Sequence, residues 1–155
     1  MQAYDDASTA FTVESTLVLS QVDPVFNANP DTADMYAYQA TYWLINGEAA
    51  PDADSIAAGA GQTLLIRYVN AGYDNTSMAL LGAHEQVVGR DGVRLANPFL
   101  ADAETIPAGA TEDVLVAVPT TAPPTLAGFP LFNRNLHLSN GSSTSVGGML
   151  TYIVP

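Results

Sequence analysis

Turn-forming residues interrupt this sequence so often that only short strands fit between them. Gly, Pro, Asn and Asp recur about every ten positions along the chain, a spacing typical of all-β sandwiches and barrels. The run 63–69 alternates, with Leu64, Ile66 and Tyr68 on one face, and the run 113–118 places three valines on one face in the same way. This pattern predicts an all-β Greek-key sandwich or barrel whose core is built from the alternating residues.

Several local signals refine this prediction. Residues 149–154 are expected to form a terminal strand, and residues 7–10 to begin a short helix. Two irregular stretches, 23–39 and 119–132, are predicted to be long loops, the second because its four prolines do not suit a central strand. Asn and Gly tolerate positive φ, as Asp does, so three dipeptides predict tight turns: Asn46-Gly47, Asp91-Gly92 and Asn140-Gly141.

The length suits one domain with one sizeable core. Neither irregular stretch separates parts that are long enough to form cores of their own. We therefore predict a single domain over residues 1–155, in which 1–11 are an N-terminal extension or the start of the domain and 119–132 are a long Pro-rich loop. The first residues have neither a basic nor an apolar leader region, so we expect no signal peptide in this chain, and no run approaches the length of a membrane helix.

Charge and composition exclude several functions. With 16 acidic residues, four Arg and no Lys, the formal net charge is −12, so nucleic-acid binding is not expected. This acidity fits a secreted or salt-adapted origin. A loop-rich composition explains the excess of Asp equally well. The chain has no Cys, which excludes disulfides, thiolate metal sites and cysteine nucleophiles. No Gly-x-Ser-x-Gly motif occurs, the adjacent acids Glu112 and Asp113 are interpreted as solvated turn residues, and we predict no catalytic residue.

The two histidines, His84 and His137, are the candidate metal ligands. They lie 53 positions apart, whereas a zinc site takes three or four protein ligands. A blue-copper centre takes two His and a Cys thiolate, which is missing. We interpret both histidines as locally bonded residues on or near strands. They remain weak candidates only, and no metal or cofactor site is predicted in this chain.

Six segments, taken in order, resemble the second domain of multicopper oxidases. Together they span about residues 12–155, and their shared order is more specific than any one of them. The segments are Thr16-Leu-Val-Leu-Ser-Gln-Val-Asp23, Tyr42-Trp-Leu-Ile-Asn-Gly47 with Pro51-Asp52, GQTLLIRYVNAG at 61–72, Gly82-Ala-His84 with Val87-Val88 and Asp91-Gly92, the run 106–116, and Asn133-Arg-Asn135 with Gly147-Gly-Met149.

This resemblance implies a cupredoxin-type fold and a copper-free structural role. In the family, His-x-His pairs and a His-Cys-His stretch in the first and third domains bind copper, and this chain has neither motif. Gly-Ala-His84-Glu stands where many relatives carry Gly-His-x-Met/His, so no histidine role is transferred. The chain would then hold the copper-bearing cupredoxin domains of the same parent protein in register. The resemblance further implies no enzyme activity in isolation, copper only in the neighbouring domains, and a secreted or periplasmic parent.

A domain of this kind presents apolar surface to its neighbours. Apolar bulk within the Pro-rich stretch makes four residues the candidate domain interface: Leu126, Phe129, Leu131 and Phe132. The alternative is a loop folded over the end of the sandwich. Two other functions stay open, namely a chain with copper or redox function of its own or within an oxidase assembly, and a free-standing secreted binding domain.

Overall fold

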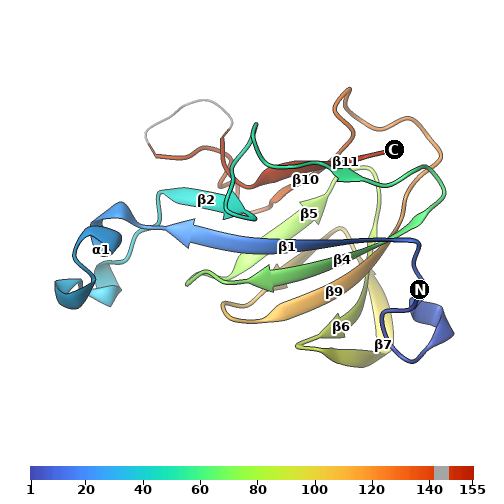
Figure 1. The fold of residues 1–155 in the computed structure, drawn as a ribbon, viewed down its shortest axis with the longest axis horizontal. Helices are drawn as coiled ribbons and strands as arrows, with labels where there is room; N and C mark the ends of the chain where they lie inside the picture. Colours follow the sequence, from blue (N-terminus) through green and yellow to red (C-terminus); the bar gives the residue numbers. More distant parts are fainter. Residues whose placement is uncertain (142–146) are drawn as a thin grey trace.

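The computed structural model describes residues 1–141 and 147–155, which form two sheets packed face to face (Figure 1). The six-stranded sheet has the order β2 (Tyr42–Ile45), β1 (Val13–Val22), β4 (Thr63–Asn70), β9 (Thr111–Ala117), β6 (Glu85–Arg90) and β7 (Val93–Ala101). The five-stranded sheet has the order β3 (Ile56–Ala57), β11 (Leu150–Val154), β10 (Phe129–Asn133), β5 (Thr76–Leu80) and β8 (Ala103–Ile106). Parallel pairing joins β1 to β4 and β3 to β11, and the other neighbours are antiparallel. The all-β sandwich prediction is confirmed.

Alternation along the strands determines which side chains form the core. Leu64 and Ile66 of β4 are buried between the sheets, as predicted, and so are Val114 and Val116 of β9. Because successive strand residues face opposite ways, Leu65 lies on the other side of the six-stranded sheet. A second buried cluster forms there, made of Phe11, Leu65, Val88 and Leu115. The N-terminal segment with its 3-10 helix η1 (Ala7–Thr9) packs near this cluster.

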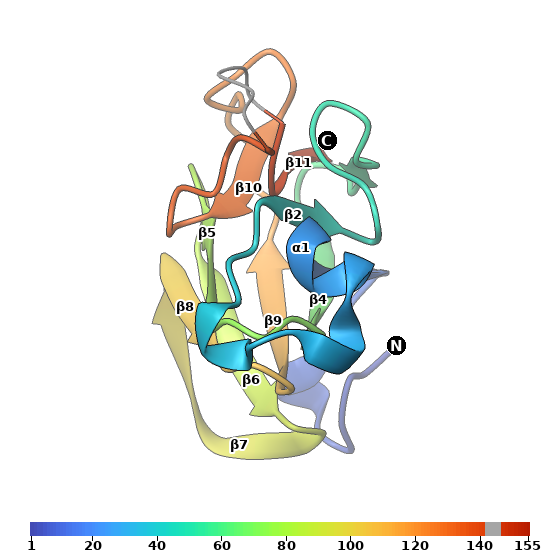
Figure 2. The same cartoon turned by 90° about the vertical axis from the view of Figure 1, so that its left-hand side faces the viewer.

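Between β1 and β2 the chain makes an excursion from Asp23 to Gln39 that protrudes from one end of the sandwich (Figure 1), the end that faces the viewer in Figure 2. The Asp23 carboxylate holds its base together. Oδ1 accepts hydrogen bonds from the backbone N–H groups of Val25 and Phe26, at 2.8 and 3.2 Å, and Oδ2 accepts one from Gln39 N–H at 2.8 Å. The predicted loop therefore has local order, in three short helices: α1 (Pro24–Ala28), η2 (Pro30–Thr32) and η3 (Met35–Ala37).

Two of the predicted tight turns adopt the positive φ values that their residues favour. Asn46 and Gly47 have φ of 53° and 83°, and Asp91 and Gly92 have φ of 50° and 75°. These are the angles that a two-residue hairpin turn requires at both central positions. Asp91-Gly92 accordingly joins β6 directly to β7.

The predicted loop 119–132 ends earlier than expected, because residues 129–133 form β10 between β5 and β11. Pro130 lies inside this strand even though it has no N–H to donate. Its carbonyl oxygen still accepts a hydrogen bond from Leu81 N–H at 2.9 Å, so Pro130 remains bonded to the chain at the end of β5. In the part of the chain that the structure describes, no helix is long and apolar enough to span a bilayer.

Candidate functional site

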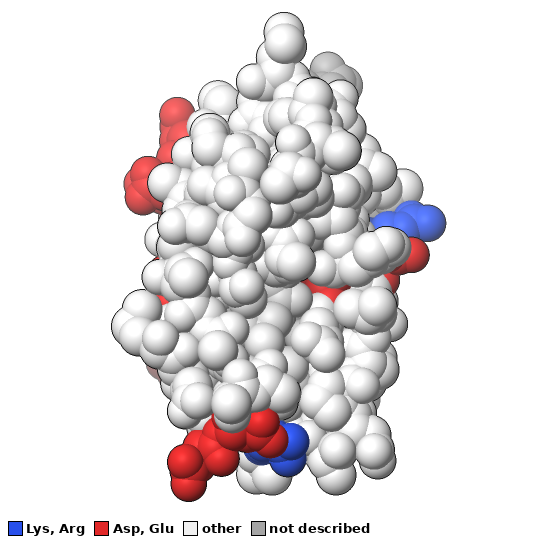
Figure 3. All heavy atoms as spheres, turned by 90° about the vertical axis from the view of Figure 1, so that its right-hand side faces the viewer, with Lys and Arg blue, Asp and Glu red and all other residues white. Residues whose placement is uncertain are grey.

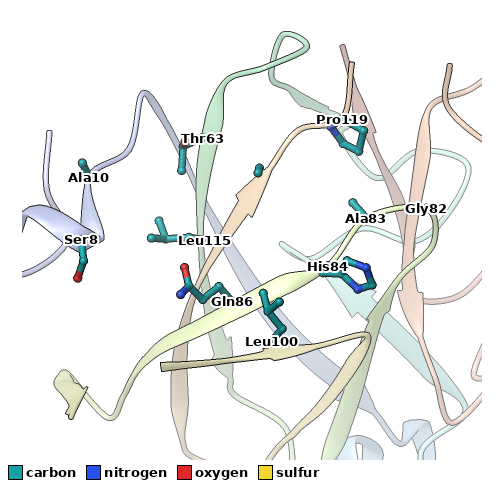
Figure 4. A pocket seen from close by; sticks show the side chains of 11 residues that line it. Ser8, Ala10, Thr63, Gly82, Ala83, His84, Gln86, Leu100, Leu115 and Pro119 are labelled. Carbon is teal, nitrogen blue, oxygen red and sulfur yellow. The ribbon is translucent and has the colours of Figure 1, made fainter. Parts of the chain in front are cut away.

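A groove of about 480 Å³ on the outer side of the six-stranded sheet contains one of the two candidate histidines. The N-terminal segment at Ser8 forms one side and the turn before β6 at His84 forms the other, with Gln86 and Leu115 between them (Figure 4). Of the described residues that line the groove, only His84 is titratable. The groove is therefore a largely neutral, open surface with a single imidazole at its edge.

His84 pairs with Asp102, which lies between β7 and β8. His84 Nδ1 and Asp102 Oδ1 are 2.5 Å apart, and both side chains are mostly exposed. A carboxylate on one ring nitrogen orients an imidazole, as it does for histidines that bind metals. Among residues 1–141 and 147–155, however, no group of three or more His, Cys, Asp and Glu is placed to hold a metal ion.

His137 packs against an aromatic side chain. Its ring stacks on Trp43, with centroids 4.1 Å apart and planes 7° from parallel. Burial lowers the pKa of His137 from its ordinary value. The contact places His137 beside β2, where Asn140 Oδ1 accepts a hydrogen bond from Trp43 N–H at 3.0 Å. His137 thus packs against β2 through an aromatic stack with a residue distant in sequence.

These donors do not fit a copper centre. A type 1 site needs a thiolate that the chain does not contain. His84 is joined by one carboxylate, and His137 is stacked on an indole ring. No chemical step through copper can be derived from such a set.

A buried acidic cluster lies inside the sandwich and was not predicted from the sequence. The Tyr68 hydroxyl donates a hydrogen bond to Glu85 Oε1 at 2.6 Å, and burial raises the pKa of Glu85 to about 7. Glu112 Oε2 accepts from Arg90 Nε at 2.8 Å, and burial also raises the pKa of Glu112 to about 7, although the Arg90 charge opposes the shift. Arg90 also pairs with Glu104 at 2.9 Å. Two core carboxyl groups therefore titrate near neutral pH.

The interpretation of Glu112 and Asp113 as solvated turn residues is wrong. Both lie within β9 and are buried, and they face opposite sides of the sheet because they are consecutive. Asp113 Oδ2 accepts hydrogen bonds from the Tyr4 hydroxyl at 2.6 Å and from Arg67 Nη1 at 2.8 Å. These contacts fasten the N-terminal segment to the sheet, and burial with the Asp113 contact raises the pKa of Tyr4 to about 12.

The four residues of the candidate interface separate into two kinds. Phe129 and Leu131 are buried in the core between the sheets, so they cannot contact another domain, and that part of the prediction needs correcting. They face inward because β10 alternates, and its inward positions are the odd-numbered ones. Leu126 is fully exposed in the loop before β10, and Phe132 is half-buried on the outer side of the five-stranded sheet.

The two mixed sheets, with this strand order, define a cupredoxin-like domain, as comparison with solved structures shows. The blue copper oxidase from Nitrosomonas europaea matches with a TM-score of 0.80 and 22% identity, covering 92% of this chain and 43% of that one. The multicopper oxidase mgLAC matches with a TM-score of 0.81 and 20% identity, covering 94% and 45%. A laccase from Botrytis aclada matches with a TM-score of 0.66 and 15% identity, covering 93% and 29%.

These matches establish a structural similarity to multicopper oxidases and laccases over most of the chain. The chain spans less than half the length of each of these three proteins. No protein-family model matches the sequence. No curated protein sequence matches it either.

Proposed function

We propose that this chain is a copper-free cupredoxin-like domain that holds the copper-bearing cupredoxin domains of a multicopper oxidase in register. The observation that carries the proposal is the structural match over 92% of this chain to less than half of a blue copper oxidase. The donor set supports the copper-free part, since the sequence has no Cys and its two histidines have unrelated surroundings. In this proposal the chain has no oxidase activity of its own and corresponds to the second domain of the three-domain oxidases. The parent protein is secreted or periplasmic.

Surface charge supports a contact with neighbouring domains at one end of the sandwich. This end carries both chain termini in Figure 1, and Figure 3 shows few charged side chains on it. The Pro-rich stretch 119–128 passes this end (Figure 1), and Leu126 within the stretch is fully exposed. Burying such a surface removes few charges from water, which keeps the desolvation cost low.

Copper titration tests the proposal directly. Cu(II) is added to the 155-residue chain, and visible absorption, electron paramagnetic resonance and a laccase-type assay are recorded. We expect a colourless protein, no copper that survives a mild chelator, and no phenol oxidation. Stoichiometric, chelator-resistant copper that is lost in His84→Ala or His137→Ala would contradict the copper-free role. A coding frame that continues into His-x-His on one side and His-Cys-His on the other would support the place in a longer oxidase.

A chain with copper or redox function of its own is the second candidate. The specific observation in its favour is the His84–Asp102 pair at the edge of the groove. In that case Asp102→Asn would weaken copper binding together with His84→Ala, while His137→Ala would leave it unchanged. Under the structural proposal all three variants behave like the parent chain.

A further inference from the structure

The outer side of the five-stranded sheet is apolar across four strands. An antiparallel sheet that faces water on one side normally alternates apolar and polar residues. Here most inward positions are apolar, apart from Thr76, Glu104, Asn133 and Thr151, and many outward ones are apolar too. Strand register places the outward residues in two rows that we call the apolar face: Ala103–Ala79–Phe132–Leu150 and Leu81–Pro130–Tyr152.

Much of this apolar face is accessible. Leu81 and Ala103 are exposed, and Phe132, Leu150 and Tyr152 are half-buried. Beside β11 the face is hollowed by about 340 Å³, between Leu150 and Tyr152 on one side and the turn 50–53 on the other. The apolar face therefore combines large apolar side chains with a hollow, as protein contact surfaces do.

Among the four strands of this face, only β8 carries a charged residue, Glu104. All 16 acidic residues fall at or before Asp113, and the stretch 114–155 contains Arg134 as its one charged residue. Two of the four strands of the face, β10 and β11, come from that stretch. A chain with a formal net charge of −12 thus presents a nearly neutral sheet surface.

We propose that a second copy of this chain packs on the apolar face across a two-fold axis, an assembly that goes beyond the proposed structural function. Two copies of an acidic protein repel each other in most orientations. Contact through the apolar face brings together the strands with the fewest charges, and it buries matching apolar rows. Because a two-fold contact uses the same patch twice, it sets the apolar rows of one copy against the apolar rows of the other.

The rim of the face supports the orientation. Arg134 directly follows β10, and its N–H donates to Ser77 O at the β5 side, at 2.7 Å. Across the strands, the turn 50–53 borders the apolar face beside Leu150 and Tyr152, and Asp52 and Asp54 flank Ala53 of this turn. Asp52 and Asp54 are both exposed. A two-fold axis parallel to the strands places Arg134 of one copy opposite these acids of the second copy, and it leaves the two sheets aligned, which is a common packing of sheets.

Sedimentation velocity on the 155-residue chain tests the proposal, over concentrations from micromolar to near-millimolar. We expect a reversible monomer–dimer equilibrium. The dimer should strengthen at high sodium chloride, because salt screens the repulsion between two acidic copies but not the apolar contact. A chain that stays monomeric at every concentration and salt level would overturn the proposal, whether the face is free or covered by another domain.

Two matched substitutions locate the contact. Leu81→Glu places a charge in the apolar face, and Leu100→Glu places the same charge on β7 of the other sheet. These side chains are 51% and 69% exposed, so both variants should fold, which circular dichroism checks. Leu81→Glu should weaken the dimer at least about tenfold, since it buries an unpaired charge twice. Equal weakening by both, or by neither, would refute this face as the contact.

The rim pair gives an independent check. Arg134→Glu should weaken the dimer, and adding Asp54→Arg to the same chain should restore much of it by exchanging the two charges. A dimer whose dissociation constant is unchanged by both substitutions would contradict the two-fold orientation.

Discussion

Glu85→Gln is expected to change how the stability of the fold depends on pH. The Glu85 side chain is buried, and its pKa rises from an ordinary value of 4.5 to about 7. The folded protein therefore keeps this proton at pH values where the unfolded chain has released it. The free energy of unfolding must fall as pH rises between these two values. At about 1.4 kcal/mol for each pKa unit, Glu85 alone lowers the stability by about 3 kcal/mol above neutral pH.

Glutamine imitates the protonated carboxyl group, and its amide oxygen can still accept the Tyr68 hydroxyl hydrogen bond. Glu85→Gln should therefore match the parent chain near about pH 4 and exceed its stability by about 3 kcal/mol near about pH 8. Urea unfolding followed by circular dichroism at both pH values measures the difference. Glu48→Gln, at an exposed glutamate, is the matched control and should leave the profile unchanged. Equal stability of Glu85→Gln and the parent chain at both pH values would refute the reasoning.

The remaining predictions concern the core and the excursion. Ile66→Ala should cost about 2–5 kcal/mol in urea unfolding because Ile66 is fully buried, and a loss well below this range would mean that the core relaxes into the space. Asp23→Ala should speed proteolysis between Val25 and Gln39 while the sandwich stays folded, because three backbone N–H groups lose their acceptor. Those same hydrogen bonds lower the pKa of Asp23, so acid should loosen the excursion only as pH falls through that lowered value, and amide exchange of Gln39 would reveal it.

The sequence predicted those parts of the fold that depend on local alternation. Leu64 and Ile66 face the core because every second residue of β4 does so, and Asn46-Gly47 turns as its residues prefer. Phe129 and Leu131 were misplaced because a Pro-rich composition conceals a central strand, whose pairing with β5 is a long-range contact.

The buried acidic cluster and the His84–Asp102 pair were harder to predict, because each joins residues that are distant in sequence. Glu85 alternates with the buried Val87, which was the available signal for an inward acid. Its hydrogen bond to Tyr68, by contrast, depends on how two non-adjacent strands lie in one sheet. The His84–Asp102 pair likewise joins two turns that no spacing rule connects.

The Asp23 carboxylate has a consequence for how the chain tolerates change. A single side chain closes both ends of the excursion, since it bonds to the first turn of α1 and to Gln39 where the chain returns. What lies between those two points does not determine how β1 meets β2. Insertions, deletions or grafted peptides between positions 29 and 37 should therefore leave the strand pairing intact, whereas the same changes at Asp23 itself should not. The excursion is thus a place where the chain can acquire new sequence without redesigning its core.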